Sequence, residues 1–192
     1  MAYKRRELTL PQMKEIYENA MTQDFPENEL KPFSSIERMY QEDRYRGYVL
    51  EENGKIQAYW MLLQDREQKT YLLDYLAVLE GKRGNGYGSK ALSCILQNIG
   101  ENEIVVIEAE NPQKAENQQQ RELQERRLEF YRRNGVVFTG VTSMVFQVPY
   151  VIMLLSRKQT ELGQEEVKQR YLDFYKKFIL DEEKTQKYVE IF

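Results

Sequence analysis

The sequence predicts an α+β domain in which a mixed, mostly antiparallel sheet of about six to seven strands is flanked by helices. Short runs rich in Val, Ile, Leu and Tyr recur along the chain, and stretches with helical spacing separate them. A further helical pattern closes the chain. A length of 192 residues suits one compact domain with one appended element.

The first third of the chain predicts two helices and a β-hairpin. Apolar residues between positions 10 and 21 and again between 36 and 40 follow helical spacing. Two strands, 48–50 and 56–63, flank the pair Asn53-Gly54. Asn-Gly readily adopts the left-handed backbone of a tight hairpin turn, so these strands are expected to pair antiparallel.

The middle of the chain predicts a strand-helix-strand unit. Residues 71–79 and 104–107 are apolar enough for strands that are covered on both faces, and 89–99 form one helical stripe between them. Residues 111–120 are polar and glutamine-rich, which predicts a mobile loop. A helix containing Leu123, Leu128, Phe130 and Tyr131 follows.

The last third predicts a hairpin and a helical tail. Asn134-Gly135 is a good helix stop, and strands 136–147 and 150–155 follow, separated by Pro149. From Gln164 onward apolar residues recur on a wide helical stripe. We expect a domain over residues 1–160 and a helical extension over 161–192, packed on that domain or on a partner subunit. The predicted assembly is a monomer or a homodimer.

Composition excludes several functions. With 28 basic and 31 acidic residues the net charge is −3, which disfavours a nucleic-acid partner. The chain contains no histidine, and its single cysteine, Cys94, lies in the predicted helix 89–99, so neither a metal site nor a disulfide is expected. No apolar run approaches membrane-spanning length and no signal peptide is visible, which predicts a cytoplasmic protein without a membrane partner.

The segment Leu76–Ser89 is the most informative. It contains a strand that enters a glycine-rich turn and then a helix, and the unpaired N–H groups at a helix start attract anions such as phosphate. The glycine spacing matches neither GxGxxG nor a P-loop, which disfavours NAD and ATP. It does fit RxxGxG, with Arg83, Gly86 and Gly88.

This RxxGxG turn resembles the coenzyme A pyrophosphate loop of the GNAT N-acetyltransferase superfamily. A second motif follows in order, because Leu128–Val136 (LEFYRRNGV) is similar to the end of the family's FYxxxG(F) helix. The resemblance covers residues 10–156 and implies a GNAT-like fold. Two departures are Val136, where the family usually has phenylalanine, and a longer loop at 111–121.

The resemblance implies a binding mode for acetyl-CoA, the expected cosubstrate. The backbone of Ala77 and Val78 would pair with the pantetheine arm. Asn111 and Asn117 are the candidates for further pantetheine contacts. The pyrophosphate would be held by the turn and the helix start, namely by Arg83, Gly84, Asn85, Gly86, Tyr87, Gly88 and Ser89.

The resemblance also implies catalytic roles. Tyr131 occupies the family's position for the acid that protonates the thiolate, although the residue pattern alone favours a core aromatic on an amphipathic helix. Glu108, at the predicted strand end, is the first choice for the base, and its alternative is a solvated cap. Asp74, inside an apolar strand, is the second choice, and its alternative is a satisfied buried hydrogen bond.

The predicted activity is transfer of an acetyl group from acetyl-CoA to a primary amine of a small molecule or peptide by direct attack. An alternative is a CoA-binding sensor or scaffold without catalysis. Acids at Asp24, Glu27 and Glu29 favour a cationic small molecule as acceptor. No motif in the sequence identifies that acceptor.

Overall fold

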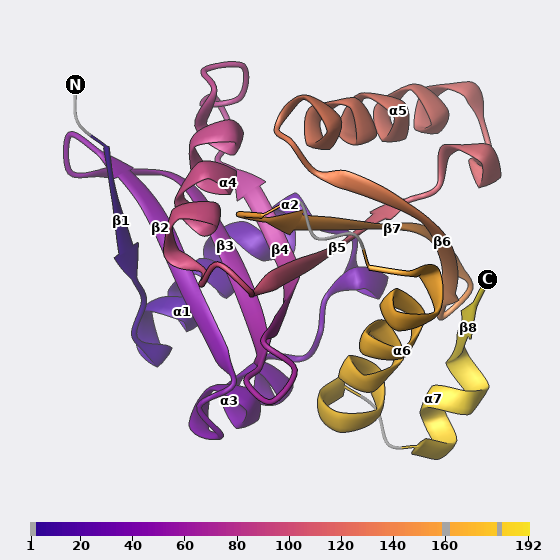
Figure 1. Cartoon of the computed structure of the whole chain (residues 1–192). Coiled ribbons are helices and arrows are strands. Elements are labelled where there is room, and N and C mark those ends of the chain that lie inside the picture. Colours follow the sequence, from indigo (N-terminus) through magenta and orange to yellow (C-terminus); the bar gives the residue numbers. More distant parts are fainter. Residues whose placement is uncertain (1–2, 159–161, 180–181) are drawn as a thin grey trace. The chain divides into compact units, whose positions relative to one another are not determined.

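The computed structural model describes residues 3–158, 162–179 and 182–192 (Figure 1). The chain divides into two compact units. Unit 1 comprises Met1–Gln64 and Leu73–Asn98, and unit 2 comprises Asp65–Leu72 and Ile99–Phe192. The described residues form eight strands, against the six to seven expected, and helices flank them.

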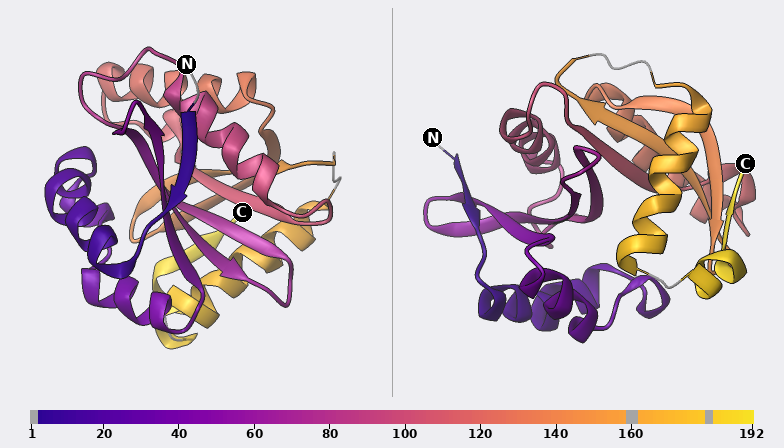
Figure 2. Two further views of the ribbon diagram at one scale, coloured as in Figure 1. Left: turned by 90° about the vertical axis from the view of Figure 1, so that its left-hand side faces the viewer. Right: turned by 60° about the horizontal axis from the view of Figure 1, so that its bottom comes forward.

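Unit 1 holds the strand order β1-β2-β3-β4. The strands are β1 (Tyr3–Glu7), β2 (Tyr45–Glu52), β3 (Lys55–Asp65) and β4 (Thr70–Val78), of which β4 begins in unit 2 and continues into unit 1. Its helical segments are α1 (Leu10–Ile16), η1 (Tyr17–Met21), α2 (Thr22–Asp24), η2 (Glu27–Glu29), α3 (Phe33–Gln41) and α4 (Tyr87–Asn98). Figure 2 shows α1 and α4 on opposite sides of the unit 1 strands.

The hairpin between β2 and β3 forms as predicted. Asn53 and Gly54 both have positive φ, 54° and 72°, the backbone of a tight antiparallel turn. On β2, a Cβ added at Gly47 would come within 2.8 Å of both Met13 Cγ and Met61 Sδ. The glycine therefore makes room for Met13 of α1 to pack directly on the strand.

Strand β1 was not predicted from the sequence. This strand pairs antiparallel with β2, with Arg6 opposite Val49. Its sequence, YKRRE, is largely exposed and lacks the apolar alternation by which strands are recognised. Charged residues on an edge strand are typical because they oppose pairing with other chains.

Unit 2 holds the strand order β5-β7-β6-β8. The strands are β5 (Ile104–Glu110), β6 (Val137–Val145), β7 (Val148–Ser156) and β8 (Val189–Ile191), and their pairs are antiparallel. The helical segments are η3 (Pro112–Lys114), α5 (Gln118–Arg133), α6 (Gln164–Phe174), η4 (Tyr175–Ile179) and α7 (Glu182–Tyr188). Helices α5 and α6 cover opposite faces of these strands (Figures 1 and 2).

Two expectations for unit 2 were wrong. The predicted loop 111–120 contains the 3₁₀ turn η3 and the first turn of α5, because the side chains of Asn111 and Asn117 cap these two segments. Pro149 does not separate the last two strands but lies inside β7, opposite Met144. The turn is made by Phe146 and Gln147, both with positive φ.

The C-terminal tail is not one helix. It contains α6, the π-helical segment η4, α7 and the strand β8, which pairs with β6. The buried side chains of α6 are Val167, Tyr171 and Phe174. The expected boundary between residues 160 and 161 lies outside the described residues, so the division into 1–160 and 161–192 stays a prediction.

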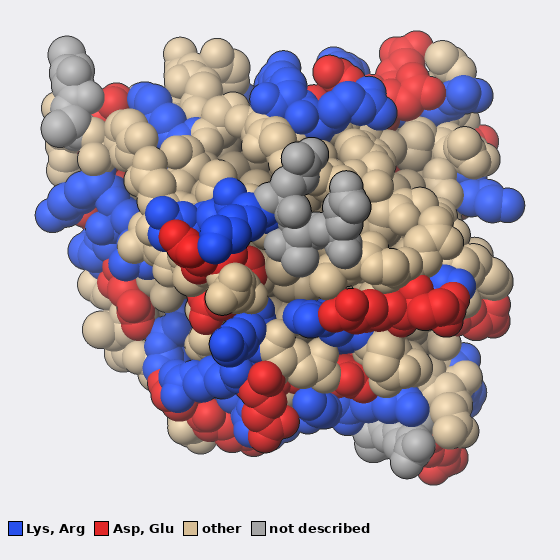
Figure 3. Space-filling model, in the orientation of Figure 1, with Lys and Arg blue, Asp and Glu red and all other residues tan. Residues whose placement is uncertain are grey.

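Charged side chains of both signs lie on the surface (Figure 3), and the single cysteine is buried. Basic and acidic side chains are interspersed on the face drawn in Figure 3. Cys94 is buried in α4, as predicted, and burial raises the pKa of its thiol. In the described part of the chain, no helix has the length and apolar character that a membrane span requires.

Candidate functional site

The glycine-rich turn of unit 1 connects the end of β4 to the start of α4. Three of its glycines, Gly81, Gly84 and Gly86, have φ of 71°, 83° and 76°. A side chain in this left-handed region costs about 1–2 kcal/mol, which explains why glycine stands at these positions. An added Cβ at any of the three would meet nothing within 4 Å, so open space borders the turn.

The N-terminus of α4 can receive an anion. The first helical hydrogen bond runs from Lys90 N–H to Gly86 O, at 3.0 Å. The N–H groups of Gly86, Tyr87, Gly88 and Ser89 therefore precede the helical bonding pattern and carry the positive end of the helix dipole. With the open space at the glycines, this end of the helix suits a phosphate group.

Tyr87, at this helix start, contacts the carboxylate of Glu52 and the ammonium of Lys90. Its hydroxyl donates to Glu52 Oε2 at 2.7 Å, and Lys90 Nζ lies 3.6 Å from Glu52 Oε1. The Tyr87 hydrogen bond, together with Lys90, lowers the pKa of the Glu52 carboxyl. The Lys90 ammonium also lies over the Tyr87 ring, 4.6 Å from its centroid.

Arg83 lies in the glycine turn and contacts a carboxylate from α2. Its Nη2 is 3.0 Å from Asp24 Oδ1, and its Nε donates to Val78 O at 3.4 Å. The other Asp24 oxygen accepts from the Tyr59 hydroxyl at 2.9 Å. The Arg83 side chain is 68% exposed, so it can turn toward a bound anion. Asp24 was expected to attract a cationic acceptor, but its carboxylate is already engaged by these two groups.

Asp74 points into unit 1 and is fully engaged. Oδ1 receives Lys31 Nζ at 2.5 Å and Oδ2 receives the Tyr45 hydroxyl at 2.6 Å. The side chains of Asp74 and Lys31 are 3% and 22% exposed. Tyr75 beside Asp74 donates its hydroxyl to Glu29 O and accepts from Lys31 N–H. This arrangement corresponds to the satisfied buried carboxylate that was the alternative to a catalytic base.

Glu108 lies inside β5, not at its end as expected, because the strand continues to Glu110. It pairs with Ile152 of β7. Its Oε1 accepts hydrogen bonds from the hydroxyls of Tyr171 and Tyr175, the latter at 2.8 Å. Glu108 is therefore held from the helical tail and is not a solvated strand cap.

Tyr131 lies on α5 and is 8% exposed. Burial raises the pKa of its phenol to about 12, although the Arg127 charge opposes the shift. Its ring packs edge-on against Phe130, with centroids 5.2 Å apart. At neutral pH the hydroxyl therefore retains its proton, the state that a proton donor requires.

The two asparagines predicted to contact pantetheine act as caps in unit 2. Asn111 Oδ1 accepts from Gln113 N–H at 3.0 Å, and Asn117 Oδ1 accepts from Gln120 N–H at 2.9 Å. Both side-chain oxygens thus stabilise the starts of helical segments. Ala77 and Val78 form the last two residues of β4 in unit 1.

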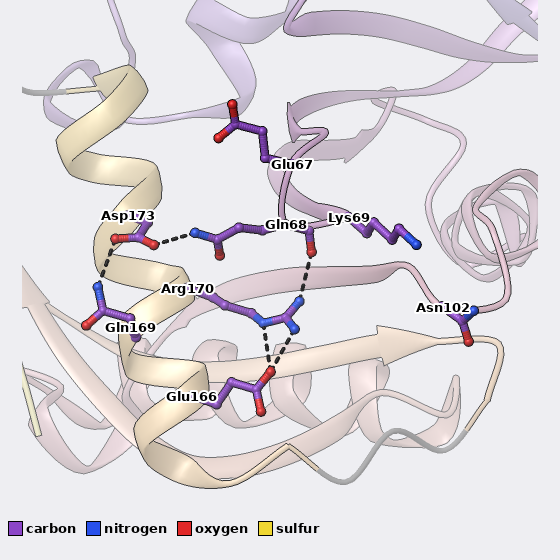
Figure 4. A pocket seen from close by; sticks show the side chains of 8 residues that line it. All are labelled: Glu67, Gln68, Lys69, Asn102, Glu166, Gln169, Arg170 and Asp173. Atoms are coloured by element: carbon purple, nitrogen blue, oxygen red, sulfur yellow. Dashed lines mark hydrogen bonds and ion pairs between the residues drawn. The ribbon is translucent and has the colours of Figure 1, made fainter.

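A pocket of about 490 Å³ in unit 2 contains none of the predicted site residues (Figure 4). Its lining residues are Glu67, Gln68, Lys69, Asn102, Glu166, Gln169, Arg170 and Asp173. Arg170 donates to Glu166, Gln68 O and Thr70 Oγ1, and Gln169 donates to Asp173. These groups bond mainly to one another.

Among the described residues, no group of histidine, cysteine, aspartate or glutamate side chains is arranged to hold a metal ion.

Comparison with known proteins identifies the family. Residues 10–136 match the model of the acetyltransferase (GNAT) family. The chain belongs to the GNAT acetyltransferase family. This match includes the glycine turn, β5 and Tyr131, and it ends before the helical tail.

Solved structures with a GNAT fold are similar to this chain. A GNAT-family protein from Bacteroides thetaiotaomicron is 14% identical with a TM-score of 0.72, over 93% of this chain and 99% of that one. The ribosomal-protein-S18-alanine N-acetyltransferase from Escherichia coli is 17% identical with a TM-score of 0.58. The match covers 83% of this chain and 97% of that one. A GNAT acetyltransferase from Elizabethkingia anophelis with acetyl-CoA bound is 12% identical with a TM-score of 0.56. The match covers 80% of this chain and 97% of that one. A search of curated proteins gave no match.

The partners of the acidic residues in this GNAT chain were not predicted from the sequence. Tyr171 and Tyr175 were recognised only as members of an apolar stripe, although their i,i+4 spacing places two hydroxyls on one helical face. Nothing in the sequence near Lys31 or Tyr45 indicated that they would meet at Asp74. Such pairs are separated by tens of residues, so only the fold brings them together.

Proposed function

We propose that this chain transfers the acetyl group of acetyl-CoA to a primary amine. The observation that carries the proposal is the turn with left-handed Gly81, Gly84 and Gly86, which leads into the open N-terminus of α4. In a GNAT-family chain, this turn corresponds to the element that binds the cosubstrate's pyrophosphate. The N–H groups of residues 84–89 would hold the phosphate oxygens, and Arg83 would add positive charge.

The other predicted binding residues complete the proposed cosubstrate site. The backbone of Ala77 and Val78 would bind the pantetheine arm in the manner of an added strand. Asn111 would contribute a side-chain contact through its amide N–H₂ group, because its oxygen is used as a cap. One of the β4 amides would polarise the thioester carbonyl.

The reaction requires three proton transfers. The acceptor ammonium gives a proton to a base, for which Glu108 is the first choice, and the resulting amine attacks the carbonyl carbon of the thioester. The C–S bond then breaks, and the thiolate takes the phenolic proton of Tyr131 to become CoA-SH. The new amide loses its extra proton to the tyrosinate. The net products are the acetylated amine, CoA-SH and one proton.

Glu108 is preferred to Asp74 as the base because of their environments. Asp74 is neutralised by the ammonium of Lys31, which lies 2.5 Å away. The Tyr171 and Tyr175 hydroxyls donate to Glu108, and hydrogen bonds to a carboxylate favour its ionised form.

We also propose that the protein is cytoplasmic. The proposed acceptor is a small cationic amine or a peptide.

The proposal is tested by incubating the protein with acetyl-CoA and a panel of primary amines, including polyamines, amino acids and short peptides. Release of CoA-SH is followed with a thiol reagent, to which the buried Cys94 contributes little background. Acetylated product is identified by mass spectrometry. Saturable binding of CoA with no acetylation of any amine would contradict the proposal and support a non-catalytic CoA-binding module.

A further inference from the structure

The carboxylate of Glu108 is bonded to two tyrosines of the helical tail. Tyr171 on α6 and Tyr175, the first residue of η4, both donate to Glu108 Oε1. Their rings pack edge-to-face, with centroids 5.2 Å apart. Residues 171 and 175 lie one helical turn apart, so both hydroxyls reach the same oxygen of a strand more than 60 residues earlier.

Burial makes this contact a strong one. Tyr171 is 0% exposed and Tyr175 is 5% exposed. Burial, and then the charge of Glu108, raises the pKa of both phenols, so each keeps its proton and acts as a donor. A carboxylate that accepts hydrogen bonds while ionised is stabilised in that form.

A third hydroxyl extends the network. Ser143 Oγ on β6 lies 3.0 Å from the Tyr171 hydroxyl oxygen, and Ser143 is 2% exposed. Because the only proton of Tyr171 is given to Glu108, Ser143 donates to Tyr171 in this arrangement. The tail, β5 and β6 are thus linked by three ordered hydroxyl contacts within unit 2.

The other nearby acid on β5 is neutralised separately. Glu110, two residues after Glu108, receives Arg127 at 2.6 Å and Gln124 at 3.1 Å from α5. Arg127 is therefore committed to Glu110. Both tyrosines lie outside residues 10–136, the part of the chain that matches the GNAT family model.

We propose that Tyr171 and Tyr175 are positioning residues that fix the Glu108 carboxylate in one orientation and keep it ionised for proton removal from the acceptor. This inference rests on the proposed function, in which Glu108 is the base. The C-terminal tail then supports the chemistry through Glu108.

Tyr175→Phe is the main test, because Tyr171→Phe would also leave the buried Ser143 hydroxyl without its acceptor. Loss of one O–H···O⁻ bond should raise the pKa of Glu108 by about one unit. The acidic limb of the plot of kcat/KM against pH should therefore shift by about one unit toward higher pH. At pH values below the Glu108 pKa, kcat/KM should be about tenfold lower than in the wild type. The KM for acetyl-CoA should not change. Tyr188→Phe, a tail tyrosine that stacks on Phe146, is the matched control and should leave the profile unchanged.

A double-mutant comparison shows whether the tyrosine acts through Glu108. Once Glu108→Gln has removed the carboxylate, adding Tyr175→Phe should cost no further activity. Independent, multiplying losses would overturn the inference. So would a Tyr175→Phe protein of lower melting temperature with an unchanged pH profile, because that result defines a purely structural role.

A ¹³C-NMR titration of the Glu108 carboxyl separates this inference from the proposed function. A wild-type chain that acetylates no amine would overturn the proposed function. An unchanged Glu108 titration in Tyr175→Phe would overturn the inference, whether or not the wild type is active. A raised Glu108 pKa in Tyr175→Phe supports it.

Discussion

The Arg83 guanidinium and the Asp24 carboxylate form an ion pair, with Nη2 and Oδ1 3.0 Å apart. Asp24 is anchored by Tyr59, whereas the Arg83 side chain is largely exposed. The exposed partner of the pair thus belongs to the proposed pyrophosphate turn, and the partner that Tyr59 also bonds belongs to α2. A phosphate group bound at the turn would compete with Asp24 for Arg83.

Asp24→Asn should strengthen CoA binding by a few-fold, because Arg83 no longer has an anionic competitor. Arg83→Ala should weaken it by up to about tenfold and reduce its salt dependence. Arg83→Ala should change stability little, because its side chain is 68% exposed and such ion pairs contribute about 0–1 kcal/mol. Asp24→Asn should cost about 1 kcal/mol, because the 10% exposed carboxylate also accepts the Tyr59 hydroxyl. Calorimetric titration with CoA at two salt concentrations checks both expectations. Weaker binding by Asp24→Asn would show that the ion pair holds the turn in its binding form.

Gly86→Ala should impair CoA binding at least tenfold and lower stability by about 1 kcal/mol, because φ is 76° and alanine is strained there. Gly54→Ala is the matched control. Gly54 has φ of 72° in the β2–β3 turn and, like Gly86, has nothing within 4 Å of an added Cβ. Its stability loss should be similar with no change in the Kd for CoA. Equal CoA affinity of the two variants would remove Gly86 from the site.

Tyr131→Phe should lower kcat by about 100-fold while leaving the Kd for acetyl-CoA within twofold. With a pKa of about 12, the Tyr131 phenol stays protonated through neutral and mildly alkaline pH. The wild-type kcat should therefore show no loss from Tyr131 ionisation below about pH 10, and such a loss should begin only as pH approaches 12. Steady-state kinetics from pH 6 to 10 test this, and an unchanged kcat in Tyr131→Phe would rule out the acid role.

Asp74→Asn should destabilise unit 1 by about 2 kcal/mol, because a nearly buried carboxylate with charge-assisted bonds to Lys31 and Tyr45 is lost. The kcat should stay within a few-fold of wild type if Glu108 is the base. Denaturant unfolding and kinetics on the same protein measure the two effects. A 100-fold fall in kcat with little change in stability would instead identify Asp74 as the base.

Most strands and helices were predictable because they follow local rules. The helix 89–99 and the strand 71–79 have clear apolar periodicity, and Asn53-Gly54 has a backbone preference of its own. Strand β1 could not be predicted in this way, since its pairing with β2 depends on backbone hydrogen bonds that any sequence can make. The break of the tail into α6, η4, α7 and β8 also lacked a local signal, because one apolar stripe continues across it.

The glycine turn, its family resemblance and the absence of histidine can all be read from the amino-acid sequence alone. Without histidine, carboxylates and tyrosines are the expected proton-transfer groups. These features depend only on residues close together in the sequence or on composition. The pairing of Asp74 with Lys31 and the hydrogen bonds of Glu108 to Tyr171 and Tyr175 became visible only in the folded chain. A buried carboxylate takes its partners from whichever residues the fold places beside it, and for Glu108 these are 63 and 67 positions away.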